Sequence, residues 1–262
     1  MALTIATWNI NSVRLRAGLV ADFLAAEAPD ILCLQETKSP VEKIPFEVFA
    51  EIGYGHWVAR GQKGYNGVAI LSRLPLEDAG HGDWCAKGDA RHVAARLPGG
   101  VVLHNFYIPA GGDEPDPETN PKFAHKLQFL DEVTAWGTGQ DGPAILVGDL
   151  NIAPLEEDVW SHRQLLKVVS HTPVETEKLK AALEAGEWVD VARDRIPMSE
   201  KVYTWWSYRS ADWTVGDRGR RLDHIWVSRA LKDAVSDFRI LRDARSWERP
   251  SDHVPVTVTL EV

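Results

Sequence analysis

Polar side chains that can bind a hard cation or transfer a proton stand directly beside short apolar runs along this chain. They are Asn9, Asn11, Gln35, Glu36, Tyr107, Asp149, Asn151, Asp223, Asp252 and His253. Because neighbouring antiparallel strands start and end at a shared sheet edge, we expect these side chains to converge on one rim. Carboxylates and carboxamides without thiols are ligands for Mg²⁺ or Mn²⁺ rather than for zinc. The pattern therefore predicts a site for a cation that prefers oxygen ligands.

Each of these positions also has a purely structural explanation. Asp149 and Asn151 can stabilise a turn with their own side chains, whereas a spacing of two in an extended chain points both side chains the same way. Asp223 can neutralise Arg220 or Arg221. No single position decides between these interpretations, but the complete set favours a functional site.

Seven short runs rich in β-forming residues are expected to be strands that carry these side chains. Several runs are almost continuously apolar, as strands packed on both faces are. The runs span residues 3–7, 31–34, 68–71, 101–106, 144–147, 222–227 and 254–260.

Three segments between the runs carry helix signals. They span residues 11–28, 120–137 and 172–186. The first stops at Pro29, and the second opens with Asn120 as N-cap and Pro121 in its first turn. The third opens with a capping box over residues 172–175.

Strands and helices mix over the full length without a linker or repeat, which predicts one α/β domain over residues 1–262. Two β-sheets packed face to face with helices outside would accommodate so many short strands. Periodicity alone leaves a doubly wound parallel sheet open as the alternative. The acidic, proline-rich segment 111–119 is expected to be an exposed loop.

The composition is that of a globular protein with an acidic balance. The chain has 262 residues, with 38 acidic and 29 basic side chains and a formal net charge of −9. Abundant apolar residues and aperiodic glycine and proline exclude disordered and collagen-like classes. The negative balance argues against binding nucleic acid or anionic membrane by bulk charge, so a nucleic-acid partner would have to meet a local basic face.

The two cysteines and the N-terminal residues indicate a reduced compartment. Cys33 lies in an apolar run and is expected in the core, and two cysteines cannot form a disulfide framework. No signal peptide is visible, and no stretch approaches the roughly 20 apolar residues of a membrane span. We expect a cytoplasmic protein with no membrane partner.

Six ordered motifs between Ala6 and Val258 resemble the endonuclease/exonuclease/phosphatase superfamily and, within it, the exonuclease III family of abasic-site endonucleases. They are residues 8–11 (Trp-Asn-Ile-Asn), 34–38 (Leu-Gln-Glu-Thr-Lys), 105–109 (Asn-Phe-Tyr-Ile-Pro), 148–152 (Gly-Asp-Leu-Asn-Ile), 221–225 (Arg-Leu-Asp-His-Ile) and 250–253 (Pro-Ser-Asp-His). The resemblance implies a four-layer α/β sandwich with the active site at one edge of its two mixed sheets.

The same resemblance implies Mg²⁺ as cofactor, with Mn²⁺ as a substitute, bound as one or two ions. Glu36 would be the principal ligand, with Asn9 and Asp252 beside it. In the family's two-metal descriptions the further ligands would be Asp149, Asn151 and His253.

The resemblance also implies catalytic roles. Asp149 would orient or deprotonate the attacking water, and Asn151 would donate a hydrogen bond to the phosphate. His253 would contact the phosphate or act as a base, with Asp223 fixing its tautomer. Tyr107 would bind the phosphate or lie near the leaving group.

Substrate contacts follow from the same comparison of motifs. Trp205 matches the aromatic residue that lines the abasic-sugar pocket in relatives, whereas Trp206 is expected to pack in the core. Arg220 stands where some relatives place a pocket tryptophan, which leaves the pocket less closed. Asn11 stands where some relatives carry aspartate, and Trp213 lies in a segment that could probe DNA.

Basic side chains near these motifs are candidates to contact DNA phosphates, with a solvated charged face as the alternative. They are Arg91, Lys122, Arg209, Arg218, Arg220 and Arg221.

The function that these features predict is a Mg²⁺-dependent DNA repair nuclease. It would act, as a monomer, on double-stranded DNA with abasic sites or blocked 3′ ends, as an abasic endonuclease, a 3′→5′ exonuclease and a 3′-phosphatase or phosphodiesterase. Superfamily phosphatases that act on phospholipids or other phosphoesters would keep the same metal site, so they remain an alternative. A non-catalytic DNA-binding module would be expected to lack some rim residues, and none of the main ones is missing.

Overall fold

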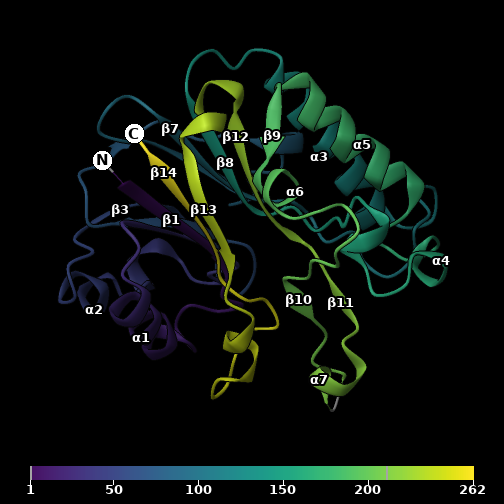
Figure 1. Ribbon diagram of the computed structural model, residues 1–262, viewed down its shortest axis with the longest axis horizontal. Helices are drawn as coiled ribbons and strands as arrows, with labels where there is room; N and C mark the ends of the chain where they lie inside the picture. Colours follow the sequence, from purple (N-terminus) through teal and green to yellow (C-terminus); the bar gives the residue numbers. More distant parts are fainter. Residues whose placement is uncertain (1, 211) are drawn as a thin grey trace.

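Two mixed β-sheets pack face to face in the computed structural model, which describes residues 2–210 and 212–262 (Figure 1). The first sheet has the order β13 (Val235–Ile240), β14 (Val256–Glu261), β1 (Ala2–Asn9), β2 (Ile31–Gln35), β4 (Val68–Ser72), β3 (His56–Arg60). The second has the order β5 (Glu77–Asp78), β6 (His92–Arg96), β7 (Val102–Tyr107), β8 (Ala144–Asp149), β12 (Asp223–Ser228), β9 (Trp188–Asp190). All seven predicted runs are strands, with ends shifted by at most two residues.

Each sheet contains one central parallel pair among antiparallel neighbours. β1 runs parallel to β2, and β7 runs parallel to β8. Parallel neighbours end at the same edge, and an antiparallel neighbour such as β12 begins there. The two sheets therefore present strand ends from distant parts of the sequence at one rim.

The core between the sheets explains the apolar runs. One face of the strands contributes residues such as Ile5, Cys33, Val147 and Ile225 to this inner layer, and all four are fully buried. The opposite face of the same strands packs against helices, so little of either face meets water. The prediction that Cys33 is a small core residue is confirmed.

A buried amide bridge joins the two sheets beneath the rim. Asn105 of β7 donates from Nδ2 to the carbonyls of Leu34 and Ala69 in the other sheet, at 3.0 Å each. Gln35 donates from Nε2 to Asn105 Oδ1 at 2.7 Å. Buried polar groups are costly unless they are hydrogen-bonded, so this bridge fixes the relative position of the sheets.

Helices complete four layers, with α1 (Ala17–Glu27) and α2 (Phe46–Ala50) outside the first sheet, and α3 (Pro121–Gly137) and α5 (Pro173–Ala185) outside the second. The predicted cap of α3 is confirmed, because Asn120 accepts a hydrogen bond from the backbone of Lys122. The capping box at the start of α5 is confirmed as well. This arrangement excludes the doubly wound parallel sheet.

The predicted start of the first helix was wrong. Asn11 and Ser12 have left-handed backbone angles, with φ of 48° and 88°, which cannot belong to a helix. The backbone N–H of Ser12 and that of Val13 donate to the carbonyls of Glu36 and Thr37. This segment therefore pairs with the loop after β2, and α1 begins only at Ala17.

The remaining helices, strands and turns are short. They are β10 (Trp205–Trp206), β11 (Gly219–Arg220), α4 (His162–Leu165), α6 (Val191–Arg195), α7 (Trp213–Gly216) and 3₁₀ turns at Val41–Lys43, Trp84–Ala86, Glu156–Asp158, Arg229–Ala234 and Arg242–Ser246. Segment 111–119 is a largely exposed loop, as predicted. Among residues 2–210 and 212–262, no helix is long and apolar enough to cross a bilayer.

Candidate active site

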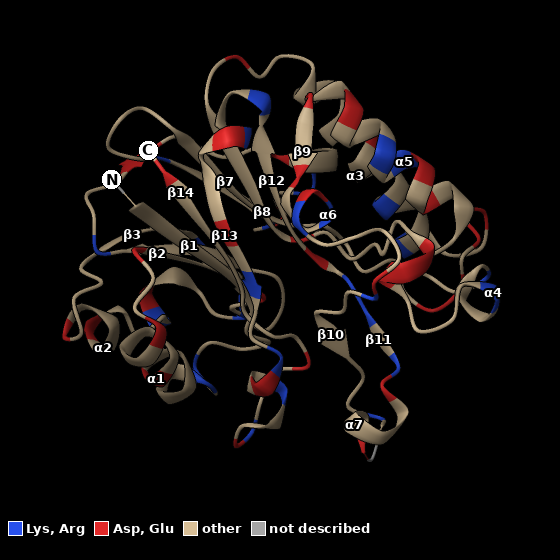
Figure 2. Ribbon diagram, viewed as in Figure 1, with Lys and Arg blue, Asp and Glu red and all other residues tan. Residues whose placement is uncertain are grey.

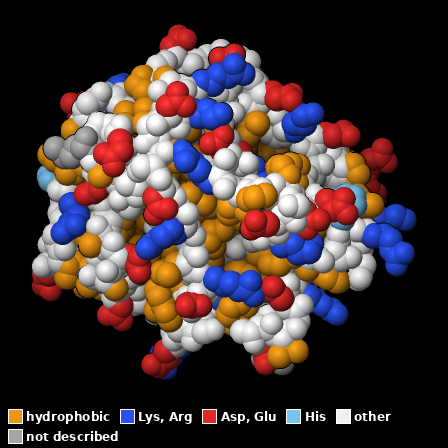
Figure 3. All heavy atoms as spheres, viewed as in Figure 1, with side chains coloured by type: hydrophobic (Ala, Val, Ile, Leu, Met, Phe, Trp, Pro, Cys, Tyr) orange, Lys and Arg blue, Asp and Glu red, His pale blue; other side chains and the backbone are white. Residues whose placement is uncertain are grey.

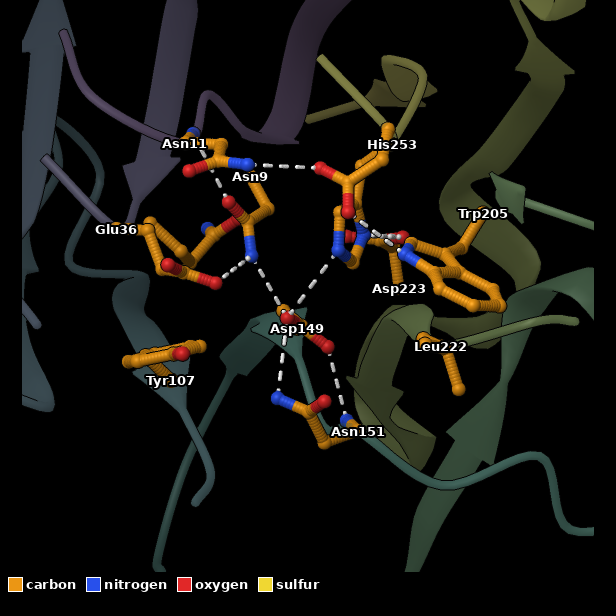
Figure 4. Close-up of polar contacts among 12 residues, drawn as sticks. Asn9, Asn11, Glu36, Tyr107, Asp149, Asn151, Trp205, Leu222, Asp223 and His253 are labelled. Carbon is orange, nitrogen blue, oxygen red and sulfur yellow. Dashed lines mark hydrogen bonds and ion pairs between the residues drawn. The ribbon is translucent and has the colours of Figure 1, made fainter. Parts of the chain in front are cut away.

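The predicted rim exists, and Figure 4 shows its side chains facing one another around Asp149. Asn9 ends β1, Tyr107 ends β7 and Asp149 ends β8, while Asp223 begins β12 directly opposite Asp149. Glu36 follows the last residue of β2. Side chains from both sheets thus meet where their strands end.

Left-handed backbone angles aim two of these side chains. Glu36 has φ of 49° and Asn151 has φ of 55°, and both residues stand just beyond a strand. Such angles are uncommon for residues other than glycine and concentrate at functional sites. Gly148 is required for a different reason, because a Cβ there would lie 1.9 Å from the carbonyl oxygen of Phe106. The chain can therefore present Asp149 only with glycine before it.

Asn9 connects the carboxylates of the two sheets. Its Nδ2 donates to Glu36 Oε1 at 3.0 Å and to Asp149 Oδ2 at 2.8 Å. Its Oδ1 accepts the backbone N–H of Asn11 at 3.0 Å. In this structure Asn9 acts as a bridge between two acids, with its oxygen engaged by the chain.

Asp149, Asp223 and His253 form what we call the acid–imidazole cluster. His253 Nδ1 lies 2.8 Å from Asp223 Oδ2, and its Nε2 lies 3.7 Å from Asp149 Oδ2. The backbone N–H of Asp223 donates to Thr204 Oγ1 at 3.0 Å, which fixes the start of β12. The ring of His253 is thus oriented by one aspartate and directed at the other.

This cluster holds more negative than positive charge in a buried place. Burial raises the pKa of Asp149 to about 7; the charge of His253 opposes this rise, whereas the charges of Asp223 and Glu36 add to it. Burial by itself would lower the pKa of His253, but Asp223 and Asp149 outweigh it and raise that pKa to about 10. Both shifts favour the protonated form, for Asp149 chiefly through burial and for His253 through the nearby carboxylates.

The cluster also fits a bound cation by its ligand atoms. One ligand atom from each of its three residues lies within 4.8 Å of the others. Asp223 Oδ1 is buried and has no hydrogen-bond partner among the described residues. Oxygen ligands without a thiol suit a hard divalent ion. Asp149 and His253, two of the predicted ligands, therefore lie with Asp223 in a group that can hold a divalent metal ion, although Asp223 was predicted to orient His253 and not to bind metal.

Lys38 is a site residue that sequence reasoning did not assign. Its ammonium group lies 2.7 Å from Glu36 Oε2 and donates to Asn11 Oδ1 at 2.6 Å. Burial would raise the pKa of Glu36, but the charge of Lys38 lowers it below its ordinary value. Its position two residues after Glu36 in a recognised motif was the available signal.

Both oxygens of Asp252 are engaged at the opposite side of the rim. Asn11 Nδ2 donates to Oδ1 at 3.1 Å, and Trp205 Nε1 donates to Oδ2 at 3.0 Å. Asn151 uses its amide protons on Asp149 Oδ2 and on the carbonyl of Ile108. Asn151 thereby orients Asp149 in this structure.

A cleft of about 630 Å³ opens beside these residues. It is lined by acidic and polar rim residues, two tryptophans and three arginines: Glu36, Asn151, Asp252, His253, Trp160, Trp205, Arg209, Arg218 and Arg220. The guanidinium of Arg220 lies 5.2 Å from the centre of the Trp205 ring. The ribbon of β11 and its flanks is coloured blue in Figure 2, which marks basic residues along this segment. Gly112 and Asp113 also line the cleft, so part of segment 111–119 contributes to its wall.

Other predicted substrate contacts lie around the rim. Arg91 packs its guanidinium 4.9 Å from the centre of the Tyr107 ring and donates to the Tyr107 carbonyl. Burial, and then the charges of Glu36 and Asp149, raise the pKa of Tyr107 well above its ordinary value, so its hydroxyl keeps its proton. Lys122 is exposed in the first turn of α3.

Arg221 does not lie where the sequence placed it. Its side chain is fully buried and forms ion pairs with Asp158 and Asp190, so it cannot contact a phosphate. Trp206 is buried, which confirms its core role, and Trp213 packs against it with ring centres 5.0 Å apart.

Comparisons with known proteins agree with this geometry. The Endonuclease/Exonuclease/phosphatase family matches residues 6–253. Exodeoxyribonuclease III of Haemophilus influenzae is 30% identical over 95% of this chain and 97% of that protein. The structure of an AP endonuclease from Archaeoglobus fulgidus has a TM-score of 0.92 and 34% identity, covering 99% of this chain and 100% of that one.

A second solved structure, the 3′ phosphatase NExo from Neisseria bound to a product DNA hairpin, has a TM-score of 0.91 at 34% identity, with the same coverage. The matches extend over nearly the whole chain. The chain therefore belongs to the endonuclease/exonuclease/phosphatase family, as a phosphodiester hydrolase of the exonuclease III type.

Proposed function

We propose that this protein is a divalent-metal-dependent DNA repair nuclease that hydrolyses phosphodiesters in duplex DNA. The observation that carries the proposal is the acid–imidazole cluster, joined to Glu36 through Asn9, beside a cleft that contains Trp205 and three arginines. The relatives reported above are named as an exodeoxyribonuclease, an AP endonuclease and a 3′ phosphatase. We propose that residues 1–262 act as one domain and as a monomer.

One site can serve three activities because each breaks the same kind of bond. Incision on the 5′ side of an abasic nucleotide, 3′→5′ removal of nucleotides, and removal of a 3′ phosphate all cleave between phosphorus and a 3′-oxygen. Each leaves a 3′-hydroxyl. We propose that the protein carries out all three, with abasic sites and blocked 3′ ends as its substrates.

The chain's own residues supply the proton transfer and orientation. Asp149, held by Asn9 and by the backbone N–H and side chain of Asn151, takes a proton from the attacking water. His253, fixed by Asp223 through Nδ1, presents Nε2 to the phosphate. Tyr107 offers its protonated hydroxyl to the same group.

Glu36, with Asn9 and Asp252, would hold Mg²⁺, for which Mn²⁺ can substitute. Asp149, Asn151 and His253 are the proposed ligands where two ions bind. When bound, the metal neutralises charge on the phosphate and stabilises the leaving 3′-oxygen.

DNA contacts rest on a few side chains around the rim. Trp205 lines the proposed pocket for the abasic sugar, which costs less to extrude than an intact nucleotide does. We propose Asn11 as a further substrate contact. Arg91, Lys122, Arg209 and Arg220 are the proposed phosphate contacts. Figure 3 shows acidic and basic side chains intermixed over the face in view, so binding to undamaged DNA should be weak and salt-sensitive.

The test is a parallel assay on three duplexes: one with an abasic analogue, one blunt and one with a 3′ phosphate. We expect all three to be processed with Mg²⁺ or Mn²⁺ and none in excess chelator. Equal cleavage in chelator would contradict the metal assignment. Hydrolysis of a phospholipid in preference to every DNA substrate would contradict the proposed substrate class.

A further inference from the structure

A fully buried lysine lies directly behind the active site. Lys126, on α3, is 0% exposed, and its ammonium group forms an ion pair with the equally buried Glu175 of α5 at 2.5 Å. Lysine and glutamate are rarely fully buried unless they are paired. Neither residue faces the cleft, and the proposed chemistry uses neither of them.

The other two protons of Lys126 reach the loops that carry the site. Its Nζ donates to the carbonyl of Asn151 at 2.8 Å and to that of Ala110 at 3.2 Å. These loops follow β8 and β7, and both Asn151 and Ala110 line the cleft. The left-handed backbone of Asn151 is strained, and such a conformation persists only when its surroundings hold it.

Glu175 extends the network to the opposite wall of the cleft. Its carboxylate accepts the backbone N–H of Ser170 at 2.9 and 3.0 Å, and it accepts the N–H and hydroxyl of Thr172 at 3.1 and 2.6 Å. Ser170 Oγ in turn accepts a hydrogen bond from Arg220 at 2.8 Å. A continuous chain of contacts therefore runs from Asn151 through the ion pair to Arg220.

Stability alone is a poor explanation for this pair. Taking two charges out of water costs free energy, and well-packed apolar residues of similar volume are often as stable or more stable. Burial lowers the pKa of Lys126, although Glu175 counteracts this effect, so burial disfavours the charged form of the lysine. What apolar residues could not replace are its directed hydrogen bonds to the two loops.

We propose that Lys126 and Glu175 are positioning residues that fix Asn151 and the Ser170–Arg220 wall in the geometry that hydrolysis requires. This inference rests on the proposed function, since it assigns a role within that reaction. The pair acts through Asn151, which orients Asp149, and touches no reacting atom.

The central test is the double variant Lys126→Met with Glu175→Gln. It removes both charges together, so no unpaired buried charge remains. The side-chain oxygen of the glutamine can still accept hydrogen bonds from Ser170 and Thr172 at the start of α5. The single variant Lys126→Met leaves Glu175 unpaired, which is strongly destabilising. The matched control is Lys178→Met, because Lys178 pairs with Asp131 across the same two helices but at the surface.

We expect the double variant to fold and to lose about 100-fold in kcat on the abasic duplex, with KM within about threefold of the wild-type value. The Lys178→Met control should keep wild-type kcat. The side-chain amide resonance of Asn151, assigned by NMR, should shift in the double variant and stay in place in the control.

Three results would overturn the inference: wild-type kcat in the double variant, failure of that variant to fold, or an equal loss of kcat in the control. An unmoved Asn151 resonance would overturn it too. This resonance needs no turnover, so it still decides the positioning role if the wild-type protein cleaves no DNA. Absence of DNA cleavage by the wild-type protein would contradict the proposed function without contradicting the positioning role.

Discussion

The acid–imidazole cluster differs from a second buried ionic cluster of the same chain in how its charges balance. In the second cluster, which we call the arginine–carboxylate cluster, Arg221 pairs with Asp158 and Asp190, and Arg193 pairs with Asp158. Two cations meet two anions, and the carboxylates accept several hydrogen bonds. The acid–imidazole cluster places two carboxylates around one imidazole and leaves Asp223 Oδ1 without a partner among the described residues.

The pKa shifts of the central aspartates of the two clusters, Asp149 and Asp158, have opposite directions. Burial raises the pKa of Asp149. Burial also acts on Asp158, but there the charges of Arg221 and Arg193 prevail and lower the pKa. A buried carboxylate whose charge is matched by cations stays ionised and stabilises the fold. A buried carboxylate without matched cations tends to bind a proton or a metal ion. Charge balance, rather than burial, separates the two roles.

The largest expected effect is the loss of kcat when the acid–imidazole cluster loses the negative charge of Asp149. Asp149→Asn should lower kcat on abasic duplex by about 10²–10⁴-fold, because the proton acceptor is removed. Its thermal unfolding should be unchanged or occur at a higher temperature, since a buried uncompensated charge is gone. Glu36→Gln is the companion variant. A near-wild-type rate in either variant would remove that residue from the mechanism.

The same change from aspartate to asparagine in the arginine–carboxylate cluster should lower the stability of the fold instead of kcat. Asp158→Asn leaves Arg221 and Arg193 short of a counter-charge, so the unfolding free energy should fall by about 3–5 kcal/mol. Denaturant titration measures this, with kcat corrected for the folded fraction as the control. Loss of kcat without loss of stability would erase the distinction between the clusters.

A neutral pair of histidines gives a third case. His92 Nε2 and His104 Nδ1 lie 3.2 Å apart, and burial lowers the pKa of His104 to about 4 and that of His92 well below its ordinary value. Because these pKa values are lowered in the folded state, the contribution of the neutral histidines to stability is complete above about pH 6.5 and is lost as the pH falls toward 4. Between pH 7 and 5, His104 alone should account for about 2 kcal/mol of that loss.

His104→Phe, compared with the wild type by denaturant titration at pH 7 and pH 5, measures this share. The variant should lose less stability on acidification. An identical loss in both proteins would mean that another group controls acid unfolding.

The smallest expected effect lies at the cleft wall. Trp205→Ala should lower abasic incision more than 3′-phosphate removal, by roughly tenfold, or about 1.4 kcal/mol, because only the abasic sugar needs the aromatic wall. The ratio of the two kcat/KM values measures it. Equal losses on both substrates would assign Trp205 a packing role, through its bond to Asp252.

Much of the fold was predictable because the central strands are locally unambiguous. Buried strands such as β2 and β8 are apolar on both faces, and helix α3 carries its own cap and stop signals. The strands that prediction missed are mostly peripheral, such as β3 and β13, whose residues are partly exposed and mixed in polarity. The start of α1 was missed because the bonds of Ser12 and Val13 to another loop are non-local.

The site was predictable as a set of residues but not as an arrangement. Arg220 and Arg221 are neighbours with the same side chain, yet one lines the cleft and the other is buried in an ion-pair network. Residue type and sequence position do not distinguish them. The partners that do, Asp158 and Ser170, lie more than 45 residues away.

The sequence by itself determined which residues end each strand, and therefore which acids, amides and imidazole stand at one rim, because strand formation and strand ends are largely local. Only the tertiary structure decided how those charges are balanced. Whether Asp149 or Asp158 has matched cations within reach depends on segments that lie far apart in the sequence, such as those of Arg193 and Arg221 beside Asp158. Electrostatic energies depend on such distances and on burial, and neither is written in the order of the residues.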